Sequence, residues 1–188
     1  KTTLARRSFA FISNSQLQRQ AMDSCYDRIS LGEDSFDSVA GRDNFRNNLI
    51  KRFPQEQAAI DEYLVRLGKV ADAMQHFTVE RMLPSLLAKA SRLVRERTMP
   101  DYFNRPTRQV LEELTSNQTL IAFLTGQWGD NGMPPAESSF VIHALIAKHY
   151  LYGGYYPIGG ASRMAETIIP QIQKTGGEVF TYAAVEQI

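Results

Sequence analysis

The chain has 188 residues, of which 43% are hydrophobic and 22% are charged. Its 21 Lys and Arg residues nearly balance its 20 Asp and Glu residues, which leaves a formal net charge of +1. This composition is typical of a soluble globular domain and gives no general attraction to nucleic acid. We therefore expect no nucleic-acid partner.

The cysteine content and the apolar runs exclude two further classes. The single cysteine, Cys25, cannot form an internal disulfide or a cysteine-rich zinc site. No apolar run approaches the roughly 20 residues of a membrane-spanning helix, and residues 1–7 do not lead into a signal-peptide core. We expect a chain that does not span a bilayer and that is cytoplasmic or peripherally associated with a membrane.

Both ends of the sequence predict a piece of a longer protein. Lys1 is not a methionine, and residues 185–188 are typical of the middle of a strand rather than of a tail. Part of any active site can then lie outside these residues.

The sequence carries no complete catalytic signature. His143 and His149 lie six residues apart, about 120° from each other on a helix, so they cannot easily bind one metal together. His76 sits beside the core-facing Phe77 and is interpreted as a structural residue. Neither a Gly-x-Ser-x-Gly elbow nor a Gly-x-Gly-x-x-Gly fingerprint occurs. We expect no metal site and assign no catalytic residue.

Residues 1–40 are expected to form strands and turns. Ser8–Ser13 and Cys25–Leu31 alternate apolar and polar residues, as half-buried strands do. Gly32–Ser35 predicts a turn, and Phe36–Val39 a returning strand of a hairpin.

Residues 41–152 are expected to be mainly helical. Phe45, Leu49 and Phe53 are four apart and predict a helix that Pro54 stops or redirects.

A long amphipathic helix is predicted after Pro54, because apolar residues repeat in steps of three and four while polar residues occupy the other side. These apolar residues are Ile60, Tyr63, Leu64, Leu67, Val70, Ala71, Met74 and Phe77. A second helical run, Leu83–Val94, is predicted to end before Met99 and Pro100.

Two further short helices and an unusual loop complete this part. Thr107 and Asn117 are predicted N-caps. Residues 126–135 place three glycines and two prolines around the only tryptophan, which predicts a loop with unusual backbone geometry. Ser138 or Ser139 is expected to cap the next helix.

Pairs of glycines divide residues 153–188 into short segments. The pattern predicts a glycine turn over 153–160, a helix over 161–174 and a strand over 179–188.

A basic stretch leaves two interpretations open. Its cations outnumber Glu96 and Asp101 and alternate with apolar residues, so the helix can lie on an anionic membrane surface or present an ordinary solvated face. The basic residues are Arg81, Lys89, Arg92, Arg95, Arg97, Arg105 and Arg108.

The glycine turn and nearby aromatic residues are candidates for ligand contact. Gly159 and Gly160 precede a helix, which leaves backbone N–H groups for a phosphate or another electron-rich group, although a tight turn alone explains them equally. Tyr155, Tyr156 and Trp128 can line a pocket for an elongated apolar ligand or simply pack.

Several spaced motifs occur in one order that is familiar from a known family. They are residues 126–135, a Ser- and His-containing helix, residues 153–160, 176–179 and 185–188, together with residues 39–42, 53–54 and 60–61 upstream. From about Cys25 onward the chain resembles FAD-dependent phytoene desaturase-like oxidoreductases, in the branch of carotenoid isomerase and retinol saturase.

This resemblance implies an α+β fold, in which a helical insertion packs with a small, mainly antiparallel sheet. Residues 1–188 would form one substrate-binding or cap domain of a glutathione-reductase-like flavoprotein, and the last strand would return toward an FAD domain. Because that family's Gly-rich fingerprint is absent from these residues, the FAD site is expected to be split and the isolated chain to be inactive.

The resemblance also implies site residues. Gly159 and Gly160 come near the flavin or the substrate, and the backbone at Val185 meets the adenine portion of FAD. The candidate substrate-binding residues are Trp128, Met133, Tyr155 and Tyr156.

The implied function is flavin-dependent desaturation, saturation or cis-trans isomerisation of a long conjugated isoprenoid, a carotenoid or a retinoid. The alternative is a helical protein-interaction module, or a peripheral membrane lipid-binding module, without catalysis. An exposed apolar face would also favour self-association of the chain.

Overall fold

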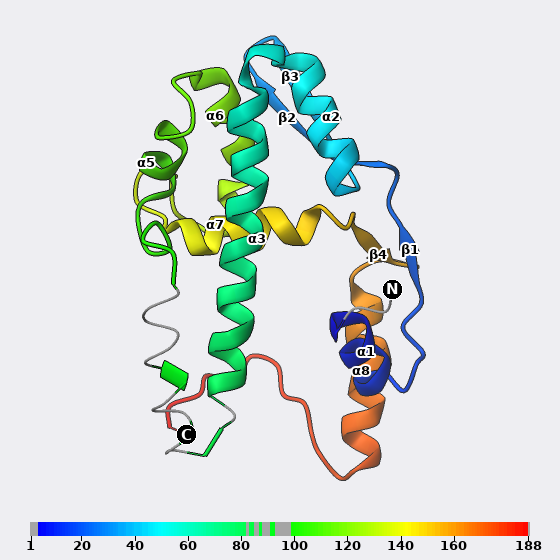
Figure 1. Cartoon of the computed structure of the whole chain (residues 1–188). Coiled ribbons are helices and arrows are strands. Elements are labelled where there is room, and N and C mark those ends of the chain that lie inside the picture. Colours follow the sequence, from blue (N-terminus) through cyan, green and yellow to red (C-terminus); the bar gives the residue numbers. More distant parts are fainter. Residues whose placement is uncertain (1–3, 82, 85–86, 88–90, 93–98, 188) are drawn as a thin grey trace. The chain divides into compact units, whose positions relative to one another are not determined.

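The computed structural model describes residues 4–81, 83–84, 87, 91–92 and 99–187 (Figure 1). These residues form two compact units. The large unit runs from Asp23 to Gly153, and the small unit joins the residues up to Met22 with those from Gly154 onward. These boundaries differ from the predicted segments 1–40, 41–152 and 153–188, and a single domain over 1–188 stays a prediction.

A β-hairpin opens the large unit. β2 (Cys25–Leu31) pairs antiparallel with β3 (Asp34–Val39), with an irregularity between Cys25 and Asp27. Gly32 in the connecting turn has φ +63°, a left-handed backbone that glycine adopts without a steric penalty. The hairpin predicted from alternation is confirmed.

Two helices follow, as the four-residue spacing predicts. α2 (Arg42–Arg52) buries Phe45 and Leu49. The chain then makes a short 3-10 turn, η1 (Pro54–Glu56), and enters α3 (Gln57–Glu80), a helix of 24 residues. Pro54 redirects the chain because its ring removes an N–H and fixes φ.

The predicted helix Leu83–Val94 falls mostly outside the described residues. Its apolar positions Leu86, Ala90, Leu93 and Val94 all lie there.

The second half of the large unit contains α5 (Thr107–Glu112), α6 (Gln118–Thr125), the 3-10 turn η2 (Trp128–Asp130) and α7 (Phe140–Tyr150). Asn117 caps α6 as predicted, because its Oδ1 accepts from the Leu120 N–H at 3.0 Å.

The predicted cap at Thr107 is wrong. Thr107 is the first residue of α5, and its hydroxyl donates to the Ser138 carbonyl at 3.0 Å. The side chain thus joins α5 to the segment before α7, a tertiary contact that competes with local capping. Ser139 occupies the predicted N-cap position of α7, but its side chain makes no capping hydrogen bond.

α7 packs across α3 to build the core of the large unit. Apolar residues from the hairpin, α2, α5 and α6 complete this core. Its most deeply buried members are Leu49, Ile60, Tyr63, Leu67, Val70, Val110, Leu111, Leu120, Phe140 and Ala144.

The small unit contains α1 (Leu4–Ile12), β1 (Arg19–Ala21), β4 (Tyr155–Pro157) and α8 (Ser162–Lys174). β1 and β4 pair antiparallel, with Arg19 opposite Pro157. Helices with two small antiparallel sheets confirm the predicted α+β class.

The predicted strand at Ser8–Ser13 is wrong, since most of it lies in α1. Phe9 and Ser13 are four residues apart and both turn inward, and the Ser13 hydroxyl donates to the Phe9 carbonyl at 2.6 Å. The four-residue spacing of Phe9 and Ser13 therefore describes this segment better than the alternation of apolar and polar residues.

The predicted strand at residues 179–188 is also wrong for the part that the structure describes. Val179–Gln187 forms no strand there. A strand needs a neighbour to share its backbone hydrogen bonds, and β1 to β4 pair only with one another.

Candidate functional site

The Trp128 loop of the large unit is held on both sides. The Gln127 side-chain amide donates to the Asp27 carboxylate at 3.2 Å, and the Tyr150 hydroxyl donates to Asp130 Oδ2 at 2.8 Å. The bond to Asp130 also raises the pKa of Tyr150. Between these anchors Trp128 remains 48% exposed. The segment that carries this large aromatic side chain is thus anchored on both sides of it, and much of the side-chain surface is open.

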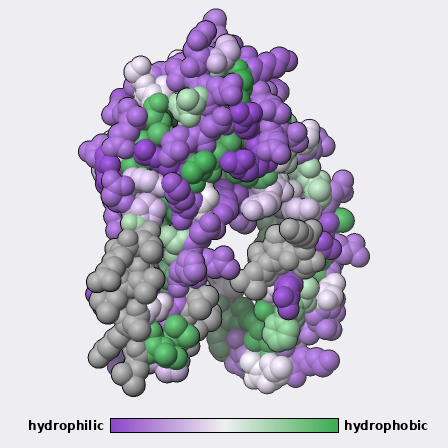
Figure 2. All heavy atoms as spheres, viewed as in Figure 1, coloured by the Kyte–Doolittle hydropathy of each residue, from purple (hydrophilic) through white to green (hydrophobic). Residues whose placement is uncertain are grey.

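Beside Trp128 lies an open groove of about 450 Å³. Apolar residues dominate its walls, and Figure 2 shows hydrophobic side chains reaching the surface among polar ones in the upper part of the view, where the hairpin and α6 lie. The lining residues come from the end of β2, from α5 and α6, and from the Trp128 loop and its continuation. Among them are Ile29, Leu31, Ile121, Ala122, Pro134 and Pro135.

Gly126 brings the end of α6 against the hairpin. A Cβ at this position would lie 2.5 to 2.7 Å from three side-chain carbons of Ile29. Only glycine permits this close approach without a shift of Ile29. Both residues line the groove, so the shape of its wall depends on the missing side chain.

Arg108 and Gln118 add polar groups to the groove. Arg108 Nε donates to Glu112 Oε1 at 2.8 Å, and its Nη2 donates to Gln118 Oε1 at 3.2 Å. The positive charge of the guanidinium is therefore compensated by a carboxylate one helical turn away.

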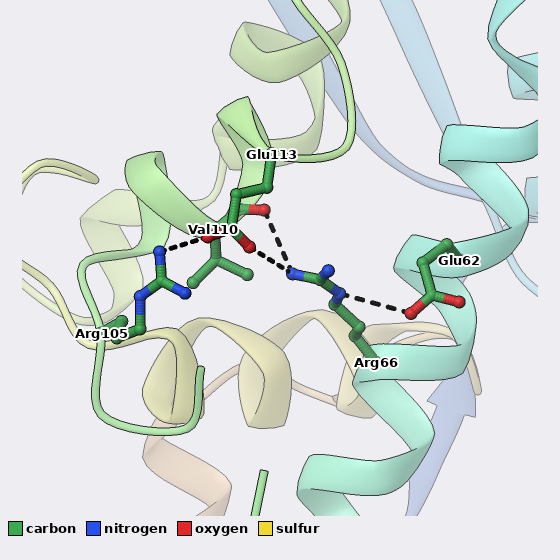
Figure 3. A network of polar contacts seen from close by, with 5 residues as sticks. All are labelled: Glu62, Arg66, Arg105, Val110 and Glu113. Carbon is green, nitrogen blue, oxygen red and sulfur yellow. Dashed lines mark hydrogen bonds and ion pairs between the residues drawn. The ribbon is translucent and has the colours of Figure 1, made fainter. Parts of the chain in front are cut away.

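A network of charged side chains fixes α5 against α3 (Figure 3). Arg66 on α3 contacts Glu113 at 3.1 Å and Glu62 at 3.4 Å, and Arg105 also pairs with Glu113. Hydrogen bonds from Arg105 and then Arg66 hold the pKa of Glu113 below its usual value. Because α5 carries Arg108, this network positions one wall of the groove.

The structure places the four predicted substrate-binding residues in two units. Trp128 and Met133 belong to the large unit, and Tyr155 and Tyr156 to the small one. Trp128 lines the groove, whereas Met133 lies outside its lining and is 46% exposed. Tyr155 and Tyr156 on β4 are 63% and 56% exposed. That the four residues share one ligand stays a prediction.

The glycine turn before α8 has the backbone that a close ligand approach needs. Gly159 and Gly160 have φ +90° and +94°, and a Cβ on Gly160 would meet nothing within 4 Å. Val185 is also open to solvent, at 76% exposure. Val185 and the turn at Gly160 are therefore accessible, and their contact with FAD stays a prediction.

A buried pair on α3 and α7 was missed by the sequence analysis. Tyr63 Oη and His143 Nε2 lie 3.0 Å apart, and both side chains are buried. Burial lowers the pKa of His143 to about 4 and raises the pKa of Tyr63 well above its usual value. The imidazole is thus neutral and structural. The spacing of His143 from Phe140 on one helix face was the available signal.

Among the described residues of the basic stretch, Arg105 and Arg108 have acidic partners. Arg105 pairs with Glu113 and Arg108 pairs with Glu112, and Arg81 lies over the Phe77 ring. Lys89, Arg95 and Arg97 lie outside the described residues. Contact of this stretch with a membrane stays a prediction.

Two kinds of feature are absent from the described residues. There, no three His, Cys, Asp or Glu side chains gather as a metal site would need. Over the same residues, every helix is too short or too polar to cross a bilayer.

The chain is similar to several curated reductases. It is 34% identical to an all-trans-retinol 13,14-reductase of Danio rerio over 94% of its length, and 31% identical to the Homo sapiens protein of the same name over 94%. Nearly the whole chain is therefore similar to one segment of the proteins named all-trans-retinol 13,14-reductase. This confirms the predicted resemblance to the retinol saturase branch.

The similarity covers only a segment of these relatives. The chain spans about 30% of each of these relatives. A further Danio rerio relative, named an inactive all-trans-retinol 13,14-reductase, is 30% identical over 79% of the chain. No protein-family model and no solved structure matches the chain.

Proposed function

We propose that this chain is the substrate-side part of an FAD-dependent oxidoreductase that reduces a double bond of a conjugated isoprenoid, with a retinoid as its substrate. The 34% identity to an all-trans-retinol 13,14-reductase over 94% of the chain carries this proposal. Among saturation, desaturation and isomerisation, the names of the relatives favour saturation.

The cofactor in this proposal is FAD. When bound, it supplies hydride transfer to the substrate. Gly159 and Gly160 would lie along it through their backbone, and Val185 would contact its adenine portion. The open turn at Gly160 and the exposure of Val185 support these roles.

The residues of the large unit would hold the polyene and exclude water from it. Trp128 offers a flat apolar surface for a conjugated chain, and the groove beside it offers apolar walls. Met133 of the large unit is exposed, and in the small unit Tyr155 and Tyr156 are exposed as well, so each of them is open to contact with a substrate. Peripheral association with a membrane would give the protein access to a lipid-dissolved substrate.

A second candidate is a non-catalytic interaction or peripheral lipid-binding protein. The similarity to a relative that is named inactive favours it, because this segment alone resembles both kinds of protein.

The absorbance spectrum of the purified full-length protein, taken after denaturation, separates the two candidates. Flavin bands from released FAD are expected if the protein is an oxidoreductase. A correctly folded protein that stays colourless after incubation with FAD would contradict the flavoprotein proposal and favour the non-catalytic one.

A further inference from the structure

We infer that the groove beside Trp128 binds the apolar body of a neutral isoprenoid alcohol. We also infer that Arg108 and Gln118 in the groove wall, together with Glu112, which pairs with Arg108, select a hydroxyl head group over a carboxylate. The inference takes its ligand class from the proposed function. It goes beyond that function by naming a site and the residues that set head-group specificity.

The size and lining of the groove suit a small apolar molecule. Its volume of about 450 Å³ lies within the range of small-molecule pockets, which is roughly 300–1,000 Å³. Ile29 and Leu31 line one part, and Ile121 and the two prolines at 134–135 line others. These side chains offer only apolar surface to an isoprenoid.

The segment that carries Trp128 is anchored before any ligand arrives. The bonds from Gln127 to Asp27 and from Tyr150 to Asp130 fix the chain on both sides of it. A ligand that stacks on the indole therefore orders little additional backbone, which reduces the entropy cost of binding.

The charges at Arg108 favour a neutral head group. Its guanidinium already donates to Glu112 and Gln118, so an incoming carboxylate would meet the Glu112 carboxylate as a like charge. A hydroxyl can accept from the guanidinium and donate to a side-chain oxygen of Glu112 or Gln118 without adding charge. Charge complementarity thus points to an alcohol.

Ligand binding can be followed by tryptophan fluorescence, because Trp128 is the only tryptophan of the chain and lines the groove. The 188-residue chain is titrated with all-trans-retinol, with the corresponding carboxylic acid and with farnesol, while Trp128 fluorescence is followed. We expect saturable changes with both alcohols, and binding of retinol at least fivefold tighter than binding of the acid.

A groove-filling substitution localises the binding. Ala136 is an exposed residue of the groove wall, so Ala136→Phe should weaken alcohol binding at least tenfold without disturbing the core. Ala122→Met fills the groove from α6 and serves as a second variant. Ala58→Phe, on an exposed position of α3, is the matched control and should bind as the parent chain does.

A charge substitution tests the head-group assignment. Glu112→Gln removes the like charge, so affinity for the acid should rise at least threefold while affinity for retinol stays within twofold. Equal effects on acid and alcohol would overturn the specificity role of Glu112.

The remaining outcomes also decide the inference. Equal binding by Ala136→Phe and Ala58→Phe, or no change with either alcohol, would overturn it and leave the flavin test of the proposed function intact. Trp128 fluorescence that changes on simple dilution, through occupation of the groove by a second copy, would overturn it as well. Binding of farnesol without retinol would support the groove and contradict the retinoid substrate.

Discussion

Tyr63 and His143 are 80 positions apart in the sequence and share a hydrogen bond of 3.0 Å between α3 and α7. This contact joins the two helices at the centre of the large-unit core. Because this pair is buried, protonation of His143 and removal of the Tyr63 hydroxyl should each change the free energy of unfolding.

Acid should destabilise the large unit through His143. The pKa of His143 is about 4 in the folded chain and 6.5 in the unfolded chain, so the unfolded state binds the proton first as the pH falls. The stabilisation that comes from keeping His143 neutral is fully present above pH 6.5 and is lost as the pH falls from 6.5 to 4. The free energy of unfolding should therefore fall by about 2 kcal/mol between pH 7.5 and pH 5. Urea unfolding at these two pH values measures the loss.

Two variants isolate that effect. His143→Gln should remove most of the loss between pH 7.5 and pH 5, whereas His149→Gln, on an exposed position of the same helix, should retain it. An equal pH dependence in both variants would contradict the assignment to His143.

Removing the Tyr63 hydroxyl should leave a buried nitrogen of His143 without its partner. We expect Tyr63→Phe to lower the free energy of unfolding by about 1–3 kcal/mol at pH 7.5. Tyr152→Phe, at a position that is 71% exposed, is the control and should change it little. Denaturant unfolding with equal midpoints for the two variants would show that the hydrogen bond contributes nothing.

The close contact at Gly126 makes a prediction about packing. Gly126→Ala places a Cβ against Ile29 and should cost about 1–3 kcal/mol of stability. Gly129→Ala, where a Cβ meets nothing within 4 Å, should be tolerated. Thermal unfolding of Gly126→Ala combined with Ile29→Ala tests the cause, since a clash with Ile29 predicts that the cost of Gly126→Ala shrinks in that background.

The glycine turn makes a prediction about the cofactor. Gly160→Val strains a backbone at φ +94° and places a side chain where FAD is proposed to lie, so FAD bound per polypeptide should fall in the full-length protein. Gly176→Val carries similar strain at φ +84° outside that turn and controls for destabilisation. Equal FAD content in both variants would remove Gly160 from the cofactor site.

Local sequence patterns predicted the elements whose signal is local. Phe45 and Leu49 marked α2, alternation marked β2, and Asn117 marked the start of α6 because its side chain caps a nearby amide. The Ser8–Ser13 prediction failed because the apolar pattern of so short a segment fits a strand and a helix equally.

The remaining features depend on contacts between distant residues. Composition pointed to Trp128, but the groove beside it needs Ile29 and Arg108, which only folding brings near. In the same way, helical spacing predicted that Tyr63 lies in the core, but it did not identify His143 as its hydrogen-bond partner. The Thr107 hydroxyl bonds to the carbonyl of Ser138, which is distant in the sequence, and a rule for local helix capping does not consider such partners.

Turnover by the full-length protein tests the central claim most directly. The protein is incubated without oxygen with FAD, a chemical reductant and all-trans-retinol, and the products are analysed by mass spectrometry. The proposal predicts a product that has gained two hydrogen atoms, in an amount that depends on the protein and on FAD. Recovery of unchanged or only isomerised retinol, from a folded protein that has bound FAD, would contradict it.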